Sequence, residues 1–156
     1  MSDALVIFGA TGDLSFRKIF PALHDMIRAG QLDCPIIGVA RSANPLDVMR
    51  ERISATMASR GGVDEAALTR LMAQFRYVQG DYGEARTYEQ LRATLGQAQH
   101  PLYYLAIPPE MFAVVASGLG RSGCARGARI VVEKPFGRDV ASAQALNREL
   151  LDVFEP

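Results

Sequence analysis

Short apolar segments alternate with longer amphipathic segments along this chain, and this alternation is the feature that most restricts its fold. The apolar segments have the length of β-strands, and several are apolar at successive positions, which is typical of strands buried on both faces. The expected strands are Leu5–Phe8, Ile36–Ala40, Phe75–Gln79, Leu102–Ile107 and Arg129–Glu133. The segments between and after them predict helices at Leu14–Ala29, Leu46–Ser59, Asp64–Ala73, Ala85–Ala98, Glu110–Arg121 and Val140–Phe154.

Strands that each lead into a helix predict a parallel sheet with helices on both faces. Right-handed crossovers then give a doubly wound, Rossmann-like α/β fold. The 156 residues fit one such domain, residues 1–156, and no repeat or charge block divides them. Pro21 removes a backbone donor within the first helical segment, so we expect a break or a fresh helix start near Phe20–Pro21. The six-stranded form of the fold has another strand after the last helix, so we expect this sequence to be the first part of a longer protein.

The composition limits the partners that the chain is expected to bind. Seventeen basic and seventeen acidic residues give a formal net charge of zero, which favours neither nucleic acid nor an anionic membrane as a partner. No apolar run is long enough to predict a membrane span, and no signal peptide is predicted. Cys34 and Cys124 are isolated from each other, without a CxxC spacing. They favour free thiols in a reducing cytoplasm over a disulfide, and no metal site is expected.

The sequence GATGDL follows the first expected strand and precedes the first expected helix. Gly9 permits a tight turn, and Gly12 lets a pyrophosphate approach the backbone without a side chain between them. Amide groups at the start of the helix donate to phosphate oxygens in such loops. The spacing departs from G-x-G-x-x-G, with Ser15 where a third glycine would stand, but the strand–loop–helix context favours phosphate binding over a plain turn. The expected phosphate-binding residues are Gly9, Thr11, Gly12, Asp13 and Leu14.

The residues after the second expected strand indicate which dinucleotide binds. In this fold an acidic residue there binds the ribose 2′-hydroxyl of NAD, whereas an arginine accommodates the 2′-phosphate of NADP. This chain has Arg41 and Ser42, and its next carboxylate is Asp47. A guanidinium pairs with a phosphate through two parallel hydrogen bonds, so we expect NADP rather than NAD. The alternative is a solvated loop arginine, because 15 of the 17 basic residues are arginines.

The chain contains only two lysines, Lys18 and Lys134. A lysine retained where arginine otherwise supplies the positive charge indicates a role for a compact ammonium group. Lys134 directly follows the fifth expected strand, at the carboxyl edge of the sheet where ligands bind in this fold. It is a candidate for holding a substrate oxygen or phosphate, or for orienting a nicotinamide. A surface lysine at a strand end is an equally good interpretation.

Two further pairs of residues fall at the same edge of the predicted sheet. Ile107 ends the fourth expected strand and Pro108 follows it, and Asp81 and Tyr82 follow the third. For each pair, the sequence allows two interpretations: the residues contact a ligand, or they only form a turn.

The two histidines are poor candidates for catalysis. His24 falls within the first expected helix and His100 in the loop before the fourth strand. Neither has a carboxylate at an obvious orienting position, so we expect both to be structural or solvated, and no residue is a convincing general base.

Five segments, taken in order, resemble the N-terminal coenzyme domain of the glucose-6-phosphate dehydrogenase family. They are GATGDLSFRKIFPAL, GVARS, YVQGDYGEARTYEQL, YYLAIPP and RIVVEKPFGRDVASAQALNREL. The resemblance covers essentially the whole chain, and the EKPFGRD segment together with the others makes it specific. It implies that Lys134 and Lys18 bind or approach glucose 6-phosphate, and that Pro135 influences where the coenzyme lies. The coenzyme-binding residues that it implies are Gly9, Thr11, Gly12, Asp13, Leu14, Lys18, Arg41, Ser42, Ile107, Pro108, Lys134 and Pro135.

The resemblance also implies a reaction that these residues do not complete. In the family, hydride passes from C1 of glucose 6-phosphate to NADP and gives the lactone, with a histidine of an RIDHYLGKE-like segment as general base. Neither that segment nor the second domain, which carries much of the substrate site and the interface of the homo-oligomer, occurs in residues 1–156. We therefore expect weak NADP binding without useful oxidation of glucose 6-phosphate. The alternatives are a free-standing NADP-binding or sensing module, and a sugar or inositol oxidoreductase with a directly catalytic EKP lysine.

Overall fold

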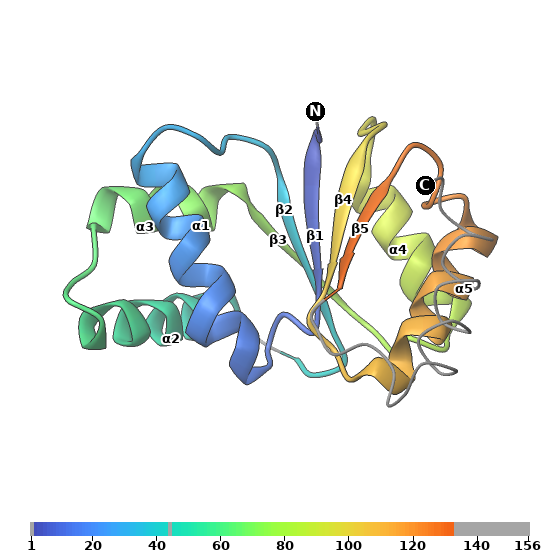
Figure 1. Cartoon of the computed structure of the whole chain (residues 1–156), viewed down its shortest axis with the longest axis horizontal. Helices are drawn as coiled ribbons and strands as arrows, with labels where there is room; N and C mark the ends of the chain where they lie inside the picture. The colour runs from blue at the N-terminus through green and yellow to red at the C-terminus, as the bar shows by residue number, and fades with distance from the viewer. Residues whose placement is uncertain (1, 44, 133–156) are drawn as a thin grey trace.

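The computed structural model describes residues 2–43 and 45–132. Within them, five strands form one sheet in the order β3-β2-β1-β4-β5, and helices lie in two layers beside it (Figure 1). The strands are β1 (Ala4–Phe8), β2 (Ile36–Ala40), β3 (Phe75–Gln79), β4 (Pro101–Leu105) and β5 (Arg129–Val132). The helical segments are the π-helix η1 (Ser15–Ile19), α1 (Phe20–Arg28), α2 (Leu46–Ser59), α3 (Glu65–Gln74), α4 (Ala85–Leu95), the short 3₁₀ helix η2 (Pro109–Met111) and α5 (Phe112–Ser122).

The sheet is doubly wound. All four strand pairs are parallel, and α1, α2 and α3 cover one face while α4 and α5 cover the other (Figure 1). The strand order runs outward in both directions from β1, first to β2 and β3 and then to β4 and β5. This arrangement confirms the predicted Rossmann-like α/β fold. It also places a topological switch point between β1 and β4, where this fold class binds its ligands.

Two hydrophobic cores lie on opposite faces of the sheet, and β1 contributes to both. Val6 and Phe8 enter the core beneath α4 and α5, whereas Ile7 enters the core beneath α1, α2 and α3, because successive side chains of a strand point to opposite faces. All five residues of β2 are buried as well. The two central strands are therefore held from both sides, which fixes the loops that follow them.

The first predicted helix changes its type where a fresh helix start was expected. Helical geometry runs without a gap from Asp13 to Arg28, and it passes from the π-helix η1, which ends at Ile19, to α1, which begins at Phe20 with Pro21 in its first turn.

Several other boundaries differ from the predicted ones by a single residue, and three differences are larger. Helix α4 ends at Leu95 rather than Ala98, because Gly96 adopts a φ of +60°. Strand β4 ends at Leu105, so Ile107 lies in the loop beyond it. The helix predicted from Glu110 is divided into η2 and α5. Glu133, the last residue of the fifth predicted strand, and the predicted helix Val140–Phe154 lie outside the described residues.

Cys34 and Cys124 are both free thiols, as predicted, and Cys124 is buried. Within the described ranges, no helix has the length and apolar character that crossing a membrane requires.

Candidate coenzyme-binding site

Apart from Lys18, the predicted site residues that the structure describes gather at the carboxyl edge of the sheet. The glycine loop, residues 9–14, follows β1, Arg41 and Ser42 follow β2, and Ile107 and Pro108 follow β4. These loops leave the sheet along its lower edge in Figure 1. Because β1 and β4 are neighbours, the loops that follow them flank the switch point.

The glycine loop is a closed turn held by its own hydrogen bonds. Gly9 has a φ of +82°, a conformation that side chains other than glycine rarely adopt. Its carbonyl oxygen accepts from the amide of Gly12 at 3.0 Å and from the hydroxyl of Ser15 at 2.8 Å. Ser15, at the position of a third glycine, is fully buried. Its side chain therefore holds the loop closed and does not face a ligand. Helical geometry begins at Asp13, and the first amides of a helix are free to bind an anion.

The two glycines of the loop meet different surroundings. A Cβ added at Gly9 would lie 2.1 Å from the carbonyl oxygen of Ala106 and 3.0 Å from a methyl carbon of Ile107. At Gly12 the nearest heavy atom would be the carbonyl oxygen of Gly9, at 3.3 Å. The fold therefore requires glycine at position 9, where the chain leaving β1 passes the end of β4. Position 12 is exposed, and its surroundings leave room for a ligand.

The residues after β2 are held in place from the neighbouring edge strand. On β3, Tyr77 donates its hydroxyl to the carbonyl oxygen of Ser42, and Gln79 donates its side-chain amide to that of Arg41 at 3.4 Å. The hydroxyl oxygens of Ser42 and Thr11 lie 3.3 Å apart. The structure thus joins the glycine loop to the predicted 2′-phosphate site, and it leaves the Arg41 side chain exposed.

Tyr82 contacts the loop in a way that the sequence did not reveal. Its hydroxyl accepts from the amide of Gly9 at 2.9 Å and donates to the carbonyl oxygen of Val39 at 3.2 Å. The side chain is buried, so the surface-turn interpretation is wrong for Tyr82. It is right for Asp81, which is exposed and accepts from the amide of Gly83. The sequence places Tyr82 at the carboxyl edge of the sheet, but it does not show in which direction the side chain points.

Lys18 lies beyond the loop, on η1. It is exposed and lines a groove of about 420 Å³ between α1 and β4, together with apolar residues such as Leu102 and Tyr104. Lys134 and Pro135 lie outside the described residues. Their predicted roles stay predictions.

His24 has a structural role, as expected, and the carboxylate of the adjacent Asp25 contacts its ring. Its Nδ1 lies 3.0 Å from a carboxylate oxygen of Asp25, and its Nε2 accepts from the amide of Asp64 at 3.0 Å. The ring is almost completely buried. The Nδ1 contact thus stays within α1, whereas the Nε2 contact joins α1 to the start of α3.

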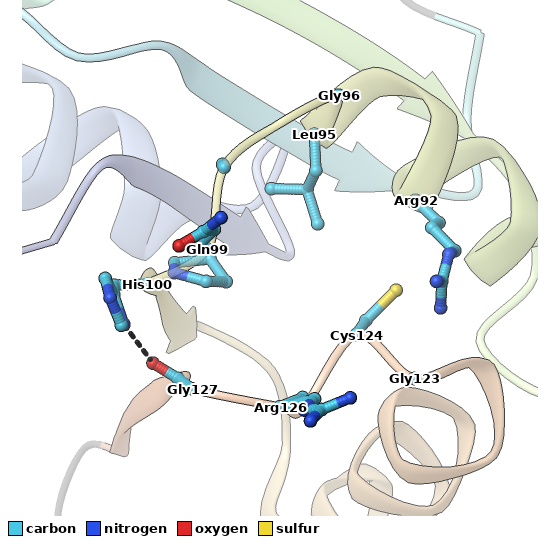
Figure 2. Close-up of a pocket in the computed structure, with 11 residues that line it drawn as sticks. Arg92, Leu95, Gly96, Gln99, His100, Gly123, Cys124, Arg126 and Gly127 are labelled. Carbon is cyan, nitrogen blue, oxygen red and sulfur yellow. Dashed lines mark hydrogen bonds between the residues drawn. The ribbon is translucent and has the colours of Figure 1, made fainter.

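His100 lies at the opposite edge of the sheet, before β4, where its Nδ1 is 3.3 Å from the carbonyl oxygen of Gly127 (Figure 2). It lines a cavity of about 500 Å³ that also receives Arg92 of α4 and Arg126 of the loop after α5. Neither histidine is placed to act at the carboxyl edge.

The comparisons with known proteins match the chain over nearly its whole length. Residues 6–156 match the family described as glucose-6-phosphate dehydrogenase, NAD binding domain. Glucose-6-phosphate 1-dehydrogenase 1 of Mycobacterium tuberculosis is 40% identical over 153 residues, which are 98% of this chain and 33% of that protein. The chain thus spans about a third of the length of this curated relative.

Two solved structures resemble the chain closely. Glucose-6-phosphate 1-dehydrogenase from Mycobacterium avium superposes with a TM-score of 0.93 at 39% identity, over 99% of this chain and 35% of that one. A glucose-6-phosphate dehydrogenase in complex with glucose 6-phosphate superposes with a TM-score of 0.84 at 32% identity, over the same shares. The chain therefore belongs to the glucose-6-phosphate dehydrogenase family, in which it corresponds to the coenzyme-binding domain.

Proposed function

We propose that the chain binds NADP along the carboxyl edge of its sheet. The observation that carries this proposal is the contact between Thr11 of the closed glycine loop and Ser42, which follows Arg41. A dinucleotide with a 2′-phosphate needs both features close together, because its pyrophosphate and its adenosine ribose are neighbours in the molecule. Calorimetric titration with NADP and with NAD tests the proposal, and we expect tighter binding of NADP.

Each part of the coenzyme has proposed contacts. The amides of Asp13 and Leu14, with the hydroxyl of Thr11, bind the pyrophosphate at the start of the first helical segment. Gly12, whose own amide donates to Gly9 within the loop, leaves room for the phosphate. Arg41 pairs with the 2′-phosphate, and Ser42 adds a hydroxyl beside it. Ile107 and Pro108 follow β4 on the other side of the switch point and line the nicotinamide pocket. The close approach of Gly9 to Ala106 and Ile107 supports this last assignment.

In a complete enzyme of this family, we propose, the domain presents NADP to glucose 6-phosphate. Hydride then passes from C1 of the sugar to the nicotinamide, which yields 6-phosphogluconolactone. Lys134 and Lys18 bind or approach the sugar phosphate in this proposal, and Pro135 influences where the coenzyme lies. The support comes from the family match and from the related enzyme solved with glucose 6-phosphate. We further propose that such an enzyme is cytoplasmic and homo-oligomeric.

The 156 residues by themselves are expected not to oxidise glucose 6-phosphate at a useful rate. The reaction requires a base to take the proton of the C1 hydroxyl, and general-base catalysis is typically worth about a hundred- to ten-thousand-fold in rate. The sequence has two histidines; His24 is buried in a structural contact and His100 lies at the far edge. NADPH formation, followed by absorbance with saturating sugar phosphate and NADP, measures the rate. A full-length relative is the positive control, and a comparable rate from this chain would contradict the expectation.

A further inference from the structure

We propose that Tyr82 is a positioning residue for the coenzyme loop, one that holds Gly9 against the end of β2. This inference rests on the proposed NADP binding. It goes further by assigning a function to a side chain that contacts the loop from behind and stays out of the ligand's path.

The contact joins three segments that are distant in the sequence. The Tyr82 hydroxyl accepts from the Gly9 amide at 2.9 Å and donates to the Val39 carbonyl oxygen at 3.2 Å. The Gly9 amide also donates directly to the same Val39 oxygen at 2.9 Å. The Tyr82 hydroxyl, the Gly9 amide and the Val39 carbonyl oxygen are therefore joined in a triangle of three hydrogen bonds. This triangle ties the end of β2 to the first residue after β1. Gly9 in turn sets the path of the loop, because its carbonyl oxygen binds both Gly12 and Ser15.

Tyr82 is itself fixed by neighbouring aromatic residues. The Tyr88 hydroxyl, from α4, donates to the Tyr82 carbonyl oxygen at 2.6 Å. The Tyr82 ring packs edge-on against Phe8, with ring centroids 5.8 Å apart. Phe8 is the last residue of β1, directly before Gly9. Both the backbone and the ring of Tyr82 are thus constrained, so its hydroxyl has little freedom to leave the loop.

The protonation state suits this role. Burial raises the pKa of the Tyr82 hydroxyl, and the hydrogen bond from the Gly9 amide opposes this only in part. The hydroxyl therefore stays protonated at neutral pH. It can donate to Val39 and accept from Gly9 at the same time, as the geometry requires.

A preset loop binds its ligand more tightly because less conformational entropy is lost on binding. Phe at position 82 would remove both hydroxyl contacts while keeping the ring against Phe8. The Gly9 amide would keep its bond to Val39, so the loop would loosen without losing its turn. We therefore expect NADP affinity to fall about fivefold, a change of about 1 kcal/mol.

The test compares Tyr82→Phe with Tyr103→Phe, using calorimetry with two ligands. Tyr103 is also buried, and its hydroxyl donates to the Cys124 carbonyl oxygen at 2.6 Å; Cys124 lines the cavity at the opposite edge (Figure 2). Tyr103→Phe thus removes a comparable buried hydrogen bond far from the loop. The ligands are NADP and adenosine 2′-monophosphate, which has the 2′-phosphate but no pyrophosphate.

We expect Tyr82→Phe to weaken NADP about fivefold and to leave adenosine 2′-monophosphate unchanged, while Tyr103→Phe changes neither affinity. Equal NADP affinity in Tyr82→Phe and wild type, or equal losses in the two variants, overturns the positioning role and leaves the proposed function intact. A wild-type chain that does not bind NADP overturns the proposed function and this inference with it. If Tyr82→Phe does not fold, Tyr88→Phe replaces it with an expected loss of about twofold, and an unchanged affinity then overturns the role.

Discussion

Gly9→Ala is expected to abolish measurable NADP binding and to lower the free energy of unfolding by about 3 kcal/mol or more. Two penalties combine at this position. The backbone has a φ of +82°, which disfavours any residue with a Cβ. The new Cβ would also lie 2.1 Å from the Ala106 carbonyl oxygen, a backbone atom that moves only if β4 moves. Urea unfolding and calorimetric titration with NADP measure the two effects.

Gly30→Ala is the matched control for this substitution. Gly30 ends α1 with a φ of +74°, and a Cβ there would have no heavy atom within 4 Å. Gly30→Ala places a Cβ on a backbone with positive φ, as Gly9→Ala does, but without a steric clash. We therefore expect the free energy of unfolding to fall by about 1 kcal/mol and the NADP affinity to stay unchanged. Equal stability losses at the two positions would show that close approach to β4 does not determine the requirement for glycine at position 9.

Arg41→Ala is expected to weaken NADP binding about tenfold to a hundredfold and to leave NAD binding unchanged. A charge-assisted hydrogen bond contributes about 1.5–3 kcal/mol, and each 1.4 kcal/mol is a factor of ten in affinity. NAD has a hydroxyl in place of the 2′-phosphate, so it offers no phosphate at this position with which the guanidinium could pair. Titration of the variant with both coenzymes measures the two affinities separately.

Arg126→Ala controls for the loss of one positive charge. Arg126 is exposed and lines the cavity at the opposite edge of the sheet (Figure 2). We expect this variant to keep the wild-type affinity for both coenzymes. If Arg126→Ala weakened NADP as much as Arg41→Ala does, the effect would come from overall charge, and the 2′-phosphate assignment would be wrong.

The strands of the sheet could be predicted from the sequence because burial on both faces leaves a continuous apolar pattern. This pattern is clearest in β2, where every residue is buried. The helix boundaries were predicted less well because single backbone conformations decide them. Gly96 ends α4 with a positive φ, and the sequence shows only that a glycine is present, not which conformation it adopts.

The glycine loop could be predicted as a turn after β1, but its internal hydrogen bonds could not. The bond from Ser15 to Gly9 depends on the path of the loop. The Tyr82 contact depends on how the loop after β3 lies against the ends of β2 and β1. Sequence spacing does not define such contacts between distant segments. For the same reason the hydrogen bond from the Asp64 amide to His24 was missed, although the structural role of His24 was predicted correctly.

The most direct test of the account is calorimetric titration of the wild-type chain with NADP and with NAD under the same conditions. We expect the chain to bind NADP at least about tenfold more tightly than NAD, because one charge-assisted contact at Arg41 supplies a difference of this size. Equal affinities, tighter binding of NAD, or no detectable binding of either coenzyme would contradict it.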